Sequence, residues 1–286
     1  MQLRIALHAA VERLTSANVP SPRMNAELLI MFTLGCDRAY LYAHPERELS
    51  PDEMQSYDEA LAKRAAGMPA QYITGHQEFW GLDLVVSPAV LIPRPETEHL
   101  VEAVRELASN LAGSSAPPRQ LFIADVGTGS GAIALALAKQ LPTARIYATD
   151  NSPAALEVAR ANAARLELTS RIDFRLTDLL DGISPSSLDL VVSNPPYVGE
   201  SEEDSVQLEV RKFEPRRAVF AGPSGLEVIE RLIPAAHLVL RPGRRLVLEI
   251  SGTIAERVRS LLSKWTEVEI RNDLQGIARV ALARKD

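Results

Sequence analysis

The chain has 286 residues, of which 46% are hydrophobic and 24% charged, a composition typical of globular proteins and long enough for two domains. The formal net charge of -6 argues against a protein whose main task is to hold nucleic-acid phosphates, because such affinity depends on clustered Lys and Arg. One cysteine cannot form an internal disulfide, and no apolar stretch approaches the ~20 residues that a membrane span requires.

The first third of the chain has the signals of helices. Ser21-Pro22 is typical of an N-cap followed by proline at the first helical position, and Gly35 predicts where that helix ends. Ser50 and Glu53 have the spacing of a capping box, which predicts a second helix start. We therefore expect a small N-terminal helical domain over residues 1–72.

The pattern then changes to extended segments interrupted by prolines. Residues 79–86 alternate as a strand does, and this predicts a β-rich connector over residues 73–93. Apolar residues recur at helical spacing from Glu96 onward, and the polar stretch 109–120 predicts a surface loop.

From residue 121 onward, predicted strands and helices alternate, as a parallel sheet requires. We expect an α/β domain over residues 94–286, closed by an antiparallel edge near the C-terminus. The predicted strands are 121–126, 145–149, 171–176, 188–193, 244–250, 267–271 and 277–283, and the predicted helices are 132–141, 152–163, 225–240 and 255–263.

A glycine-rich loop lies where the first strand of this domain turns into its helix. Three glycines let the backbone approach a ligand closely, and the helix N-terminus offers free N–H groups. The same glycines also satisfy the loose dinucleotide-binding pattern, so they do not decide the ligand by themselves. The predicted cofactor-binding residues of this loop are Gly127, Thr128, Gly129, Ser130 and Gly131.

Polar residues also follow the next two predicted strands. Asp150 ends the second strand, where a carboxylate can accept hydrogen bonds from two ribose hydroxyls. The alternative is that Asp150 caps the next helix. After the third strand, Asp178 and Leu179 are placed to meet an adenine ring, although solvated loop residues would have the same pattern.

The residues Asn194, Pro195, Pro196 and Tyr197 follow the apolar run 188–193, which predicts a buried parallel strand. Two prolines remove backbone donors, so this loop presents carbonyl oxygens and an amide side chain. Asn194 and the Pro195 carbonyl could accept both hydrogens of a planar NH2 group, while Tyr197 packs on the group that bears it. Ligands bind at this end of strands in open α/β sheets, which favours an active-site loop over a simple proline turn.

The joint pattern of the glycine-rich loop, Asp150 and Asn-Pro-Pro-Tyr resembles Rossmann-like class I S-adenosylmethionine-dependent methyltransferases that modify planar amino groups. A hydride-transfer enzyme has no evident use for the proline-locked loop. Four further segments, matching over essentially the whole chain, are similar to the PrmC/HemK family of release-factor glutamine methyltransferases: 69–75, 78–82, 91–98 and 273–276 with Arg279.

The resemblance implies a mostly parallel seven-stranded sheet and transfer of a methyl group to the side-chain amide nitrogen of the glutamine in the Gly-Gly-Gln motif of class I release factors. S-adenosylmethionine is then the methyl donor and S-adenosylhomocysteine the product. Asn194, Pro195 and Tyr197 would be catalytic and, with Pro196, would bind the substrate; Asn194 would also border the cofactor. The chain departs from the usual family pattern at Leu179, where an aromatic residue is common, and at Ser251, which replaces a glycine.

Three other functions stay open at this point. The chain could methylate a ribosomal-protein glutamine or a base amino group in nucleic acid, or it could be a binding module that keeps the fold without catalysis. The acidic net charge weighs against a nucleic-acid substrate. Residues 92–96, which resemble the release-factor version of the family, weigh against a ribosomal-protein substrate, and the presence of all the cofactor and acceptor residues weighs against a binding module.

The remaining expectations concern cellular location, metal binding and binding partners. The N-terminus lacks the apolar core of a signal peptide, and the histidines have no metal-ligand spacing. We expect a cytoplasmic monomer without a metal site, which binds release factors and neither membranes nor nucleic acids.

Overall fold

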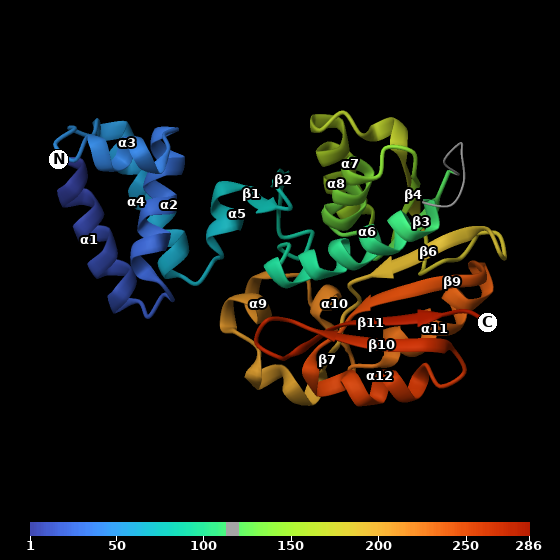
Figure 1. Cartoon of the computed structure of the whole chain (residues 1–286). Helices are drawn as coiled ribbons and strands as arrows, with labels where there is room; N and C mark the ends of the chain where they lie inside the picture. Colours follow the sequence, from blue (N-terminus) through green and yellow to red (C-terminus); the bar gives the residue numbers. More distant parts are fainter. Residues whose placement is uncertain (113–119) are drawn as a thin grey trace. The chain divides into compact units, whose positions relative to one another are not determined.

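A computed structural model describes residues 1–112 and 120–286 of the chain (Figure 1). The described residues divide into two compact units. Residues 1–76 and 207–213 form the first unit, and residues 77–206 and 214–286 form the second. The first unit therefore includes a segment distant in sequence, which the predicted boundaries at residues 72 and 93 did not anticipate.

The first unit is helical. Its helices are α1 (Leu3–Ser16), α2 (Pro22–Leu34), α3 (Arg38–Ala43), α4 (Pro51–Ala65), α5 (Ala70–Thr74) and the distant α9 (Leu208–Phe213). The predicted capping box at the start of α4 is confirmed, because Ser50 Oγ accepts from the Glu53 N–H at 3.2 Å and Glu53 Oε2 accepts from the Ser50 N–H at 2.9 Å. Gly35 ends α2 in a left-handed conformation, as predicted.

Ser21 occupies the N-cap position of α2 and Pro22 is its first residue, as predicted, but Ser21 does not cap the helix with its side chain. Ser21 has a positive φ of 48° and makes no side-chain capping bond. Instead, Asn25 Nδ2 donates to the carbonyls of Pro20 and Ser21 at 2.9 and 3.2 Å. The turn before α2 is thus stabilised by Asn25, a residue within the helix, and a Ser-Pro pattern does not predict this contact.

A buried arginine joins α9 to the rest of the first unit. Arg64 of α4 donates through Nη2 to Glu209 Oε2 at 2.8 Å and through Nε to Asn25 Oδ1 at 2.7 Å. Lys212 Nζ donates to the Ala66 carbonyl at 3.4 Å. Polar contacts of this kind hold residues 207–213 in the unit.

The second unit contains a seven-stranded sheet in the order β10-β11-β9-β6-β3-β4-β5. Neighbouring strands from β9 to β5 are parallel, and β11 is antiparallel to both β9 and β10. The predicted mostly parallel sheet with an antiparallel edge is thus confirmed. The strands are β3 (Phe122–Val126), β4 (Arg145–Asp150), β5 (Ile172–Leu176), β6 (Leu188–Ser193), β9 (Leu240–Glu249), β10 (Thr266–Asn272) and β11 (Ala278–Arg284).

Helices and short strands complete the second unit. The predicted surface loop 109–120 is wrong over 109–112, which continue a helix, and residues 113–119 lie outside the described part of the chain. The helices are α6 (Glu98–Ala112), α7 (Ala132–Gln140), α8 (Pro153–Arg165), α10 (Arg216–Val219), α11 (Glu227–Val239) and α12 (Ala255–Leu261), and the short strands are β1 (His76–Phe79), β2 (Leu82–Val85), β7 (Val198–Gly199) and β8 (Phe220–Gly222).

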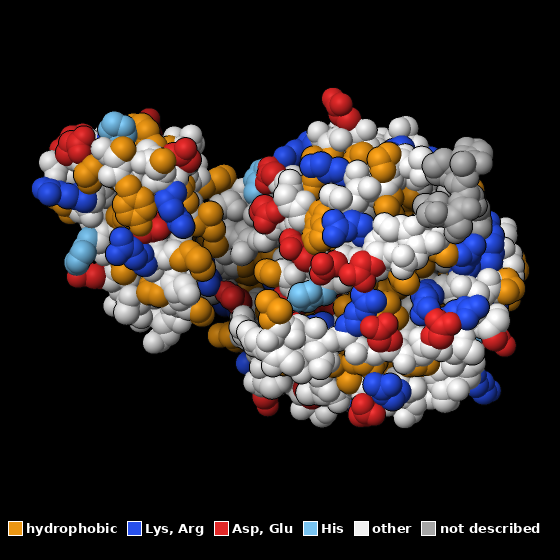
Figure 2. Space-filling view, viewed as in Figure 1, with side chains coloured by type: hydrophobic (Ala, Val, Ile, Leu, Met, Phe, Trp, Pro, Cys, Tyr) orange, Lys and Arg blue, Asp and Glu red, His pale blue; other side chains and the backbone are white. Residues whose placement is uncertain are grey.

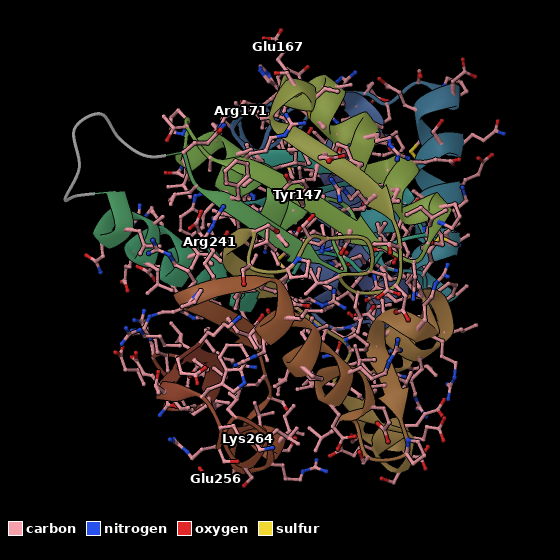
Figure 3. All side chains as sticks on the ribbon, turned by 90° about the vertical axis from the view of Figure 1, so that its right-hand side faces the viewer. Tyr147, Glu167, Arg171, Arg241, Glu256 and Lys264 are labelled. Atoms are coloured by element: carbon pink, nitrogen blue, oxygen red, sulfur yellow. The ribbon has the colours of Figure 1, made fainter. Side chains whose placement is uncertain are left out.

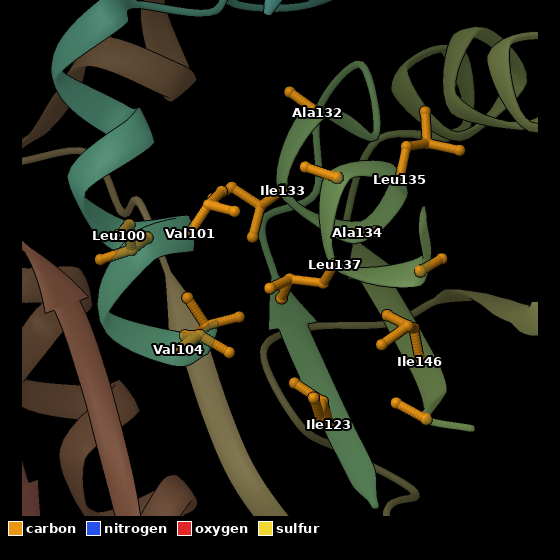
Figure 4. Packing of buried hydrophobic residues seen from close by; sticks show 14 of the residues in the cluster. Leu100, Val101, Val104, Ile123, Ala132, Ile133, Ala134, Leu135, Leu137 and Ile146 are labelled. Carbon is orange, nitrogen blue, oxygen red and sulfur yellow. The ribbon is translucent and has the colours of Figure 1, made fainter. Parts of the chain in front are cut away.

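Alternating residues of the strands face two hydrophobic cores, one on each side of the sheet. On one side, Leu100 and Val104 of α6 and Leu137 of α7 pack toward Ile123 of β3 and Ile146 of β4 (Figure 4). On the other side, α11 and α12 cover β3, β6, β9 and β11. Apolar packing on both faces explains why the buried strands are nearly continuous in hydrophobicity.

The face of the sheet that α11 and α12 cover also carries aromatic and arginine side chains. Tyr147 lies over the strands (Figure 3), with its ring 6.5 Å from that of Phe122. The Arg175 guanidinium lies 4.6 Å from the Tyr147 ring and that of Arg241 5.5 Å from the Phe122 ring. These long side chains cover apolar rings while keeping their charged ends near water.

The strand order places two loops next to each other. Val126, the last residue of β3, pairs with Ser193, the last residue of β6. Connections leave β3 and β6 toward opposite halves of the sheet, which makes this a topological switch point, where ligands bind in open α/β folds. The helices within residues 1–112 and 120–286 are not long and apolar enough to cross a membrane.

Candidate active site

The glycine-rich loop after β3 is held open by its backbone. Gly127 and Gly129 have φ values of 73° and 56°, and a Cβ on Gly127 would meet no atom within 4 Å. The N–H groups of Gly127 and Thr128 both donate to the Thr149 carbonyl at 2.9 Å. The loop is therefore anchored to β4 and leaves space above its glycines for a ligand.

A buried carboxyl lies under this loop. Asp125 Oδ2 accepts from the Thr128 hydroxyl at 2.6 Å and from the Ala134 N–H at 3.1 Å, and its Oδ1 has no partner among the described residues. Burial raises the pKa of Asp125 to about 7, against the lowering effect of these two bonds. Asp125 fixes the turn into α7, a role that the sequence analysis did not assign to it.

Asp150 meets the same loop from the end of β4. Its Oδ2 accepts from the Gly129 N–H and its Oδ1 from the Ser152 N–H, both at 2.9 Å. The cap of α8 is Ser152, whose Oγ accepts from the Ala155 N–H at 3.2 Å. A carboxylate has about four acceptor positions, so Asp150 retains capacity for ribose hydroxyls.

Asp178 and Leu179, which follow β5, also line the cavity. Asp178 pairs with Arg231 of α11, and the Leu179 carbonyl accepts from the Thr149 hydroxyl at 2.8 Å. Leu179 has a positive φ of 49°, a strained value for a residue with a Cβ. The hydrogen bond from Thr149 holds this conformation beside the end of β4.

Asn194 is oriented by a threonine from the 91–98 segment. Asn194 Nδ2 donates to Thr97 Oγ1 at 3.1 Å, and Thr97 is buried. The Asn194 Oδ1 atom stays available as an acceptor. Asn194, Pro195 and Pro196 line the same cavity as Gly127 and Asp150.

Tyr197 lies outside the set of described residues that line the cavity. Its hydroxyl donates to Glu249 Oε1 at 3.3 Å, and its ring packs against the core under α11 and α12. Burial raises the pKa of Tyr197 far above its usual range, with a further contribution from Glu249. Gly225 (φ 80°) contacts this loop so closely that a Cβ would lie 2.7 Å from the Tyr197 carbonyl oxygen. Only glycine fits there.

Residues that the sequence analysis did not single out line the cavity or contact residues that do. Glu214 is buried; it accepts from the Ile92 N–H at 3.1 Å and pairs with Arg94, which lines the cavity. Arg217 donates to Ser152 Oγ at 2.8 Å. Arg94 and Thr97 belong to a segment that the family resemblance had marked, whereas Glu214 and Arg217 carried no sequence signal. Eight of the nine predicted cofactor-binding residues line the cavity: Gly127, Thr128, Gly129, Ser130, Asp150, Asp178, Leu179 and Asn194. The ninth, Gly131, is the N-cap of α7, and a Cβ there would lie 3.1 Å from Leu135 and 3.3 Å from Ala159.

This arrangement fits S-adenosylmethionine. Gly127 and Gly129 leave open space for the ligand, and a carboxylate with spare acceptor capacity lies at the end of β4. An amide acceptor from the neighbouring strand lines the same cavity. Together with the sheet order, these features define a class I S-adenosylmethionine-dependent methyltransferase.

Comparison with known proteins identifies the family. Residues 6–75 match the PrmC N-terminal domain and residues 101–212 match the methyltransferase small domain. The release factor glutamine methyltransferase of Koribacter versatilis is 53% identical, over 100% of this chain and 99% of that protein. That of Moorella thermoacetica is 44% identical, over 99% and 98%. The chain belongs to the release factor glutamine methyltransferase family.

Solved structures agree on the fold. The hMettl16 catalytic domain, in complex with a 3'UTR hairpin, has a TM-score of 0.54 and 18% sequence identity, covering 79% of this chain and 82% of that one. At this identity the likeness concerns the fold alone.

We expect Asp150→Ala to weaken S-adenosylmethionine binding by ~1–3 kcal/mol, about 5- to 150-fold in Kd, because hydrogen bonds to a charged group are lost. Calorimetric titration measures the change. Asp181→Ala, an exposed aspartate in a nearby loop, is the matched control and should bind normally. Unchanged affinity in a folded Asp150 variant would contradict the assignment.

Proposed function

We propose that this protein transfers a methyl group from S-adenosylmethionine to the side-chain amide nitrogen, N5, of the glutamine in the Gly-Gly-Gln motif of class I peptide chain release factors. The observation that carries the proposal is the pairing of Val126 with Ser193, which brings a cofactor loop and an Asn-Pro-Pro-Tyr loop together in a chain of this family.

An amide nitrogen is a poor nucleophile because its lone pair is delocalised into the carbonyl. Asn194 Oδ1 and the Pro195 carbonyl would accept its two hydrogens, while Tyr197, which lies outside the cavity lining, would affect the placement of the amide through the loop that it belongs to. Acceptors at these positions favour the positive charge that grows on nitrogen as the new bond forms, which is transition-state stabilisation. Orienting the reactants adds a large contribution, since effective molarities can reach about 10⁵ M.

S-adenosylmethionine supplies a methyl group activated by its sulfonium and leaves as S-adenosylhomocysteine. The loop 127–131 and Asp150 would hold the donor, with Asp178 and Leu179 at its adenine. The extra proton on the methylated nitrogen is acidic and can leave to water, so no carboxylate is needed to remove it at the start.

We assign recognition of the release factor to the N-terminal helices. A glutamine side chain offers few contacts, whereas specific protein complexes bury ~1,200–2,000 Å². On α2, Met24, Leu28 and Phe32 recur at i, i+4 and i+8 as an apolar stripe, with Met24 58% and Phe32 50% exposed. Figure 2 shows hydrophobic side chains on the surface of this unit. Exposed apolar side chains of this kind are typical of protein contact sites.

The proposal includes a monomeric enzyme in the cytoplasm, where peptide release occurs, with no direct nucleic-acid contact. The acidic net charge of -6 supports the last point.

The direct test is to incubate the enzyme with methyl-labelled S-adenosylmethionine and to offer a class I release factor, ribosomal proteins or duplex DNA in parallel. We expect label on the release factor, and its loss when the motif glutamine is replaced by alanine. Label on a ribosomal protein or on DNA, with none on the release factor, would replace this function with one of the alternatives.

A further inference from the structure

Glu249 is a buried carboxyl behind the Asn-Pro-Pro-Tyr loop that the proposed chemistry does not use. It is the last residue of β9 and is only 3% exposed. Its Oε1 accepts from the Tyr197 hydroxyl at 3.3 Å, and its Oε2 has no hydrogen-bond partner among the described residues. A buried carboxyl with an unsatisfied oxygen is costly, which calls for an explanation.

Thr97 connects the same carboxyl to the other end of the loop. Its oxygen accepts from Asn194 Nδ2 at 3.1 Å, so its own proton must point elsewhere. The Thr97 and Tyr197 hydroxyls both favour the carboxylate form of Glu249 and so lower its pKa, against the larger raising effect of burial. Tyr197 therefore contacts Glu249 directly, and Asn194, three residues earlier in the acceptor loop, is bonded to the threonine whose hydroxyl acts on the same carboxyl.

The charged groups around Glu249 act in opposite directions. Burial is the largest influence and Glu96 acts in the same direction, so that the pKa of Glu249 is raised to about 7. Arg279 lowers it, and is itself paired with Asp273 at 2.8 Å. The carboxyl therefore changes its protonation state near neutral pH.

We propose that Glu249 is a positioning residue for methyl transfer: as a carboxylate it accepts the Thr97 and Tyr197 hydroxyls and thereby fixes the Asn194 amide with Nδ2 on Thr97 and Oδ1 toward the substrate. The inference rests on the proposed function, because it assigns Asn194 to the acceptor nitrogen. No covalent step involves Glu249.

The protonation state decides the direction of these hydrogen bonds. A carboxylate can only accept, so both hydroxyls point at it. A protonated Glu249 donates one hydrogen bond, which reverses one hydroxyl and removes the constraint on the Asn194 amide. Turnover should therefore rise with pH through the pKa of Glu249, and be low when Glu249 is protonated.

The test compares Glu249→Gln with the wild type in kcat at saturating substrates between pH 5.5 and 9, values chosen to span about 1.5 units on either side of neutrality. Glutamine keeps the shape but can accept through one oxygen only. We expect kcat to fall roughly tenfold, the size of one lost hydrogen bond to a charged group, and the rise with pH to disappear. KM for the release factor and affinity for S-adenosylmethionine should be unchanged. Glu249→Asp should restore the pH dependence.

Asp189→Asn is the matched control. Asp189 is fully buried at the opposite end of β6, where Arg241 and Arg244 lie 2.8 and 3.3 Å from its oxygens. This variant should lose thermal stability but keep the wild-type pH dependence of kcat.

Wild-type kcat with an intact pH dependence in folded Glu249→Gln would overturn the inference. If that variant does not fold, Thr97→Val removes the link between the carboxyl and Asn194, and wild-type kcat there would overturn it equally. Failure of the wild type to label the release factor would instead overturn the proposed function, so the two failures are distinguishable.

Discussion

Replacing Asn194 with alanine is expected to slow methyl transfer by roughly 10²–10³, the usual effect of losing one preorganised polar contact to a reacting group. Affinity for S-adenosylmethionine should change much less, because the glycine-rich loop and Asp150 are untouched. Thr97 holds the amide at 3.1 Å, so the acceptor oxygen is fixed before substrate arrives. Removing the Asn194 amide therefore slows the chemical step more than it weakens S-adenosylmethionine binding.

Single-turnover methylation of release factor measures this effect without interference from product release. Asn110→Ala, an exposed asparagine on α6, is the matched control and should react at the wild-type rate. A wild-type rate in the Asn194 variant would mean that the acceptor nitrogen binds elsewhere.

Deleting residues 1–72 is expected to leave S-adenosylmethionine binding largely intact while lowering kcat/KM for intact release factor by at least about 10²-fold. Truncation of interface hot spots costs ≥ 2 kcal/mol each, and every 1.4 kcal/mol is tenfold. A short Gly-Gly-Gln peptide should be methylated equally by both forms, because it contacts the pocket alone.

The deletion also removes the helices with which residues 207–213 are grouped, so a full-length variant is needed beside it. Met24→Ser with Phe32→Ser changes only the exposed stripe on α2 and should raise KM for intact release factor. Leu238→Ser, 60% exposed on α11, is the control. If both the deletion and the double variant methylate release factor with unchanged kcat/KM, the N-terminal helices have only a structural role.

The sequence predicted most of the sheet because local signals and long-range packing agree there. Strand β6 is an apolar run ended by Asn-Pro-Pro, and β3 ends at glycines, so each boundary has a chemical cause. Eight of the nine predicted cofactor-site residues line the cavity, because they lie at or follow the ends of β3, β4, β5 and β6. Their roles in binding S-adenosylmethionine stay predictions.

The contacts that support the site could not be predicted, because they join residues far apart in the chain. Thr97 and Asn194 are 97 positions apart, and Tyr197 and Glu249 are 52 apart. Propensity and periodicity describe neighbours along the chain and carry no information on such pairs. The same applies to α9, whose membership of the first unit depends on the Arg64–Glu209 contact.

One peptide bond joins the two units at Phe213 and Glu214. Phe213 ends the segment grouped with the N-terminal helices, and the Glu214 carboxylate holds the Ile92 N–H and Arg94 at the wall of the cavity. A peptide bond is planar and does not stretch, so displacement of residue 213 must be absorbed by rotation at the adjoining φ and ψ angles or passed to residue 214. The chain passes between the units at residues 76–77, 206–207 and 213–214, and the last of these crossings is the one directly next to a side chain that pairs with the cavity-lining Arg94.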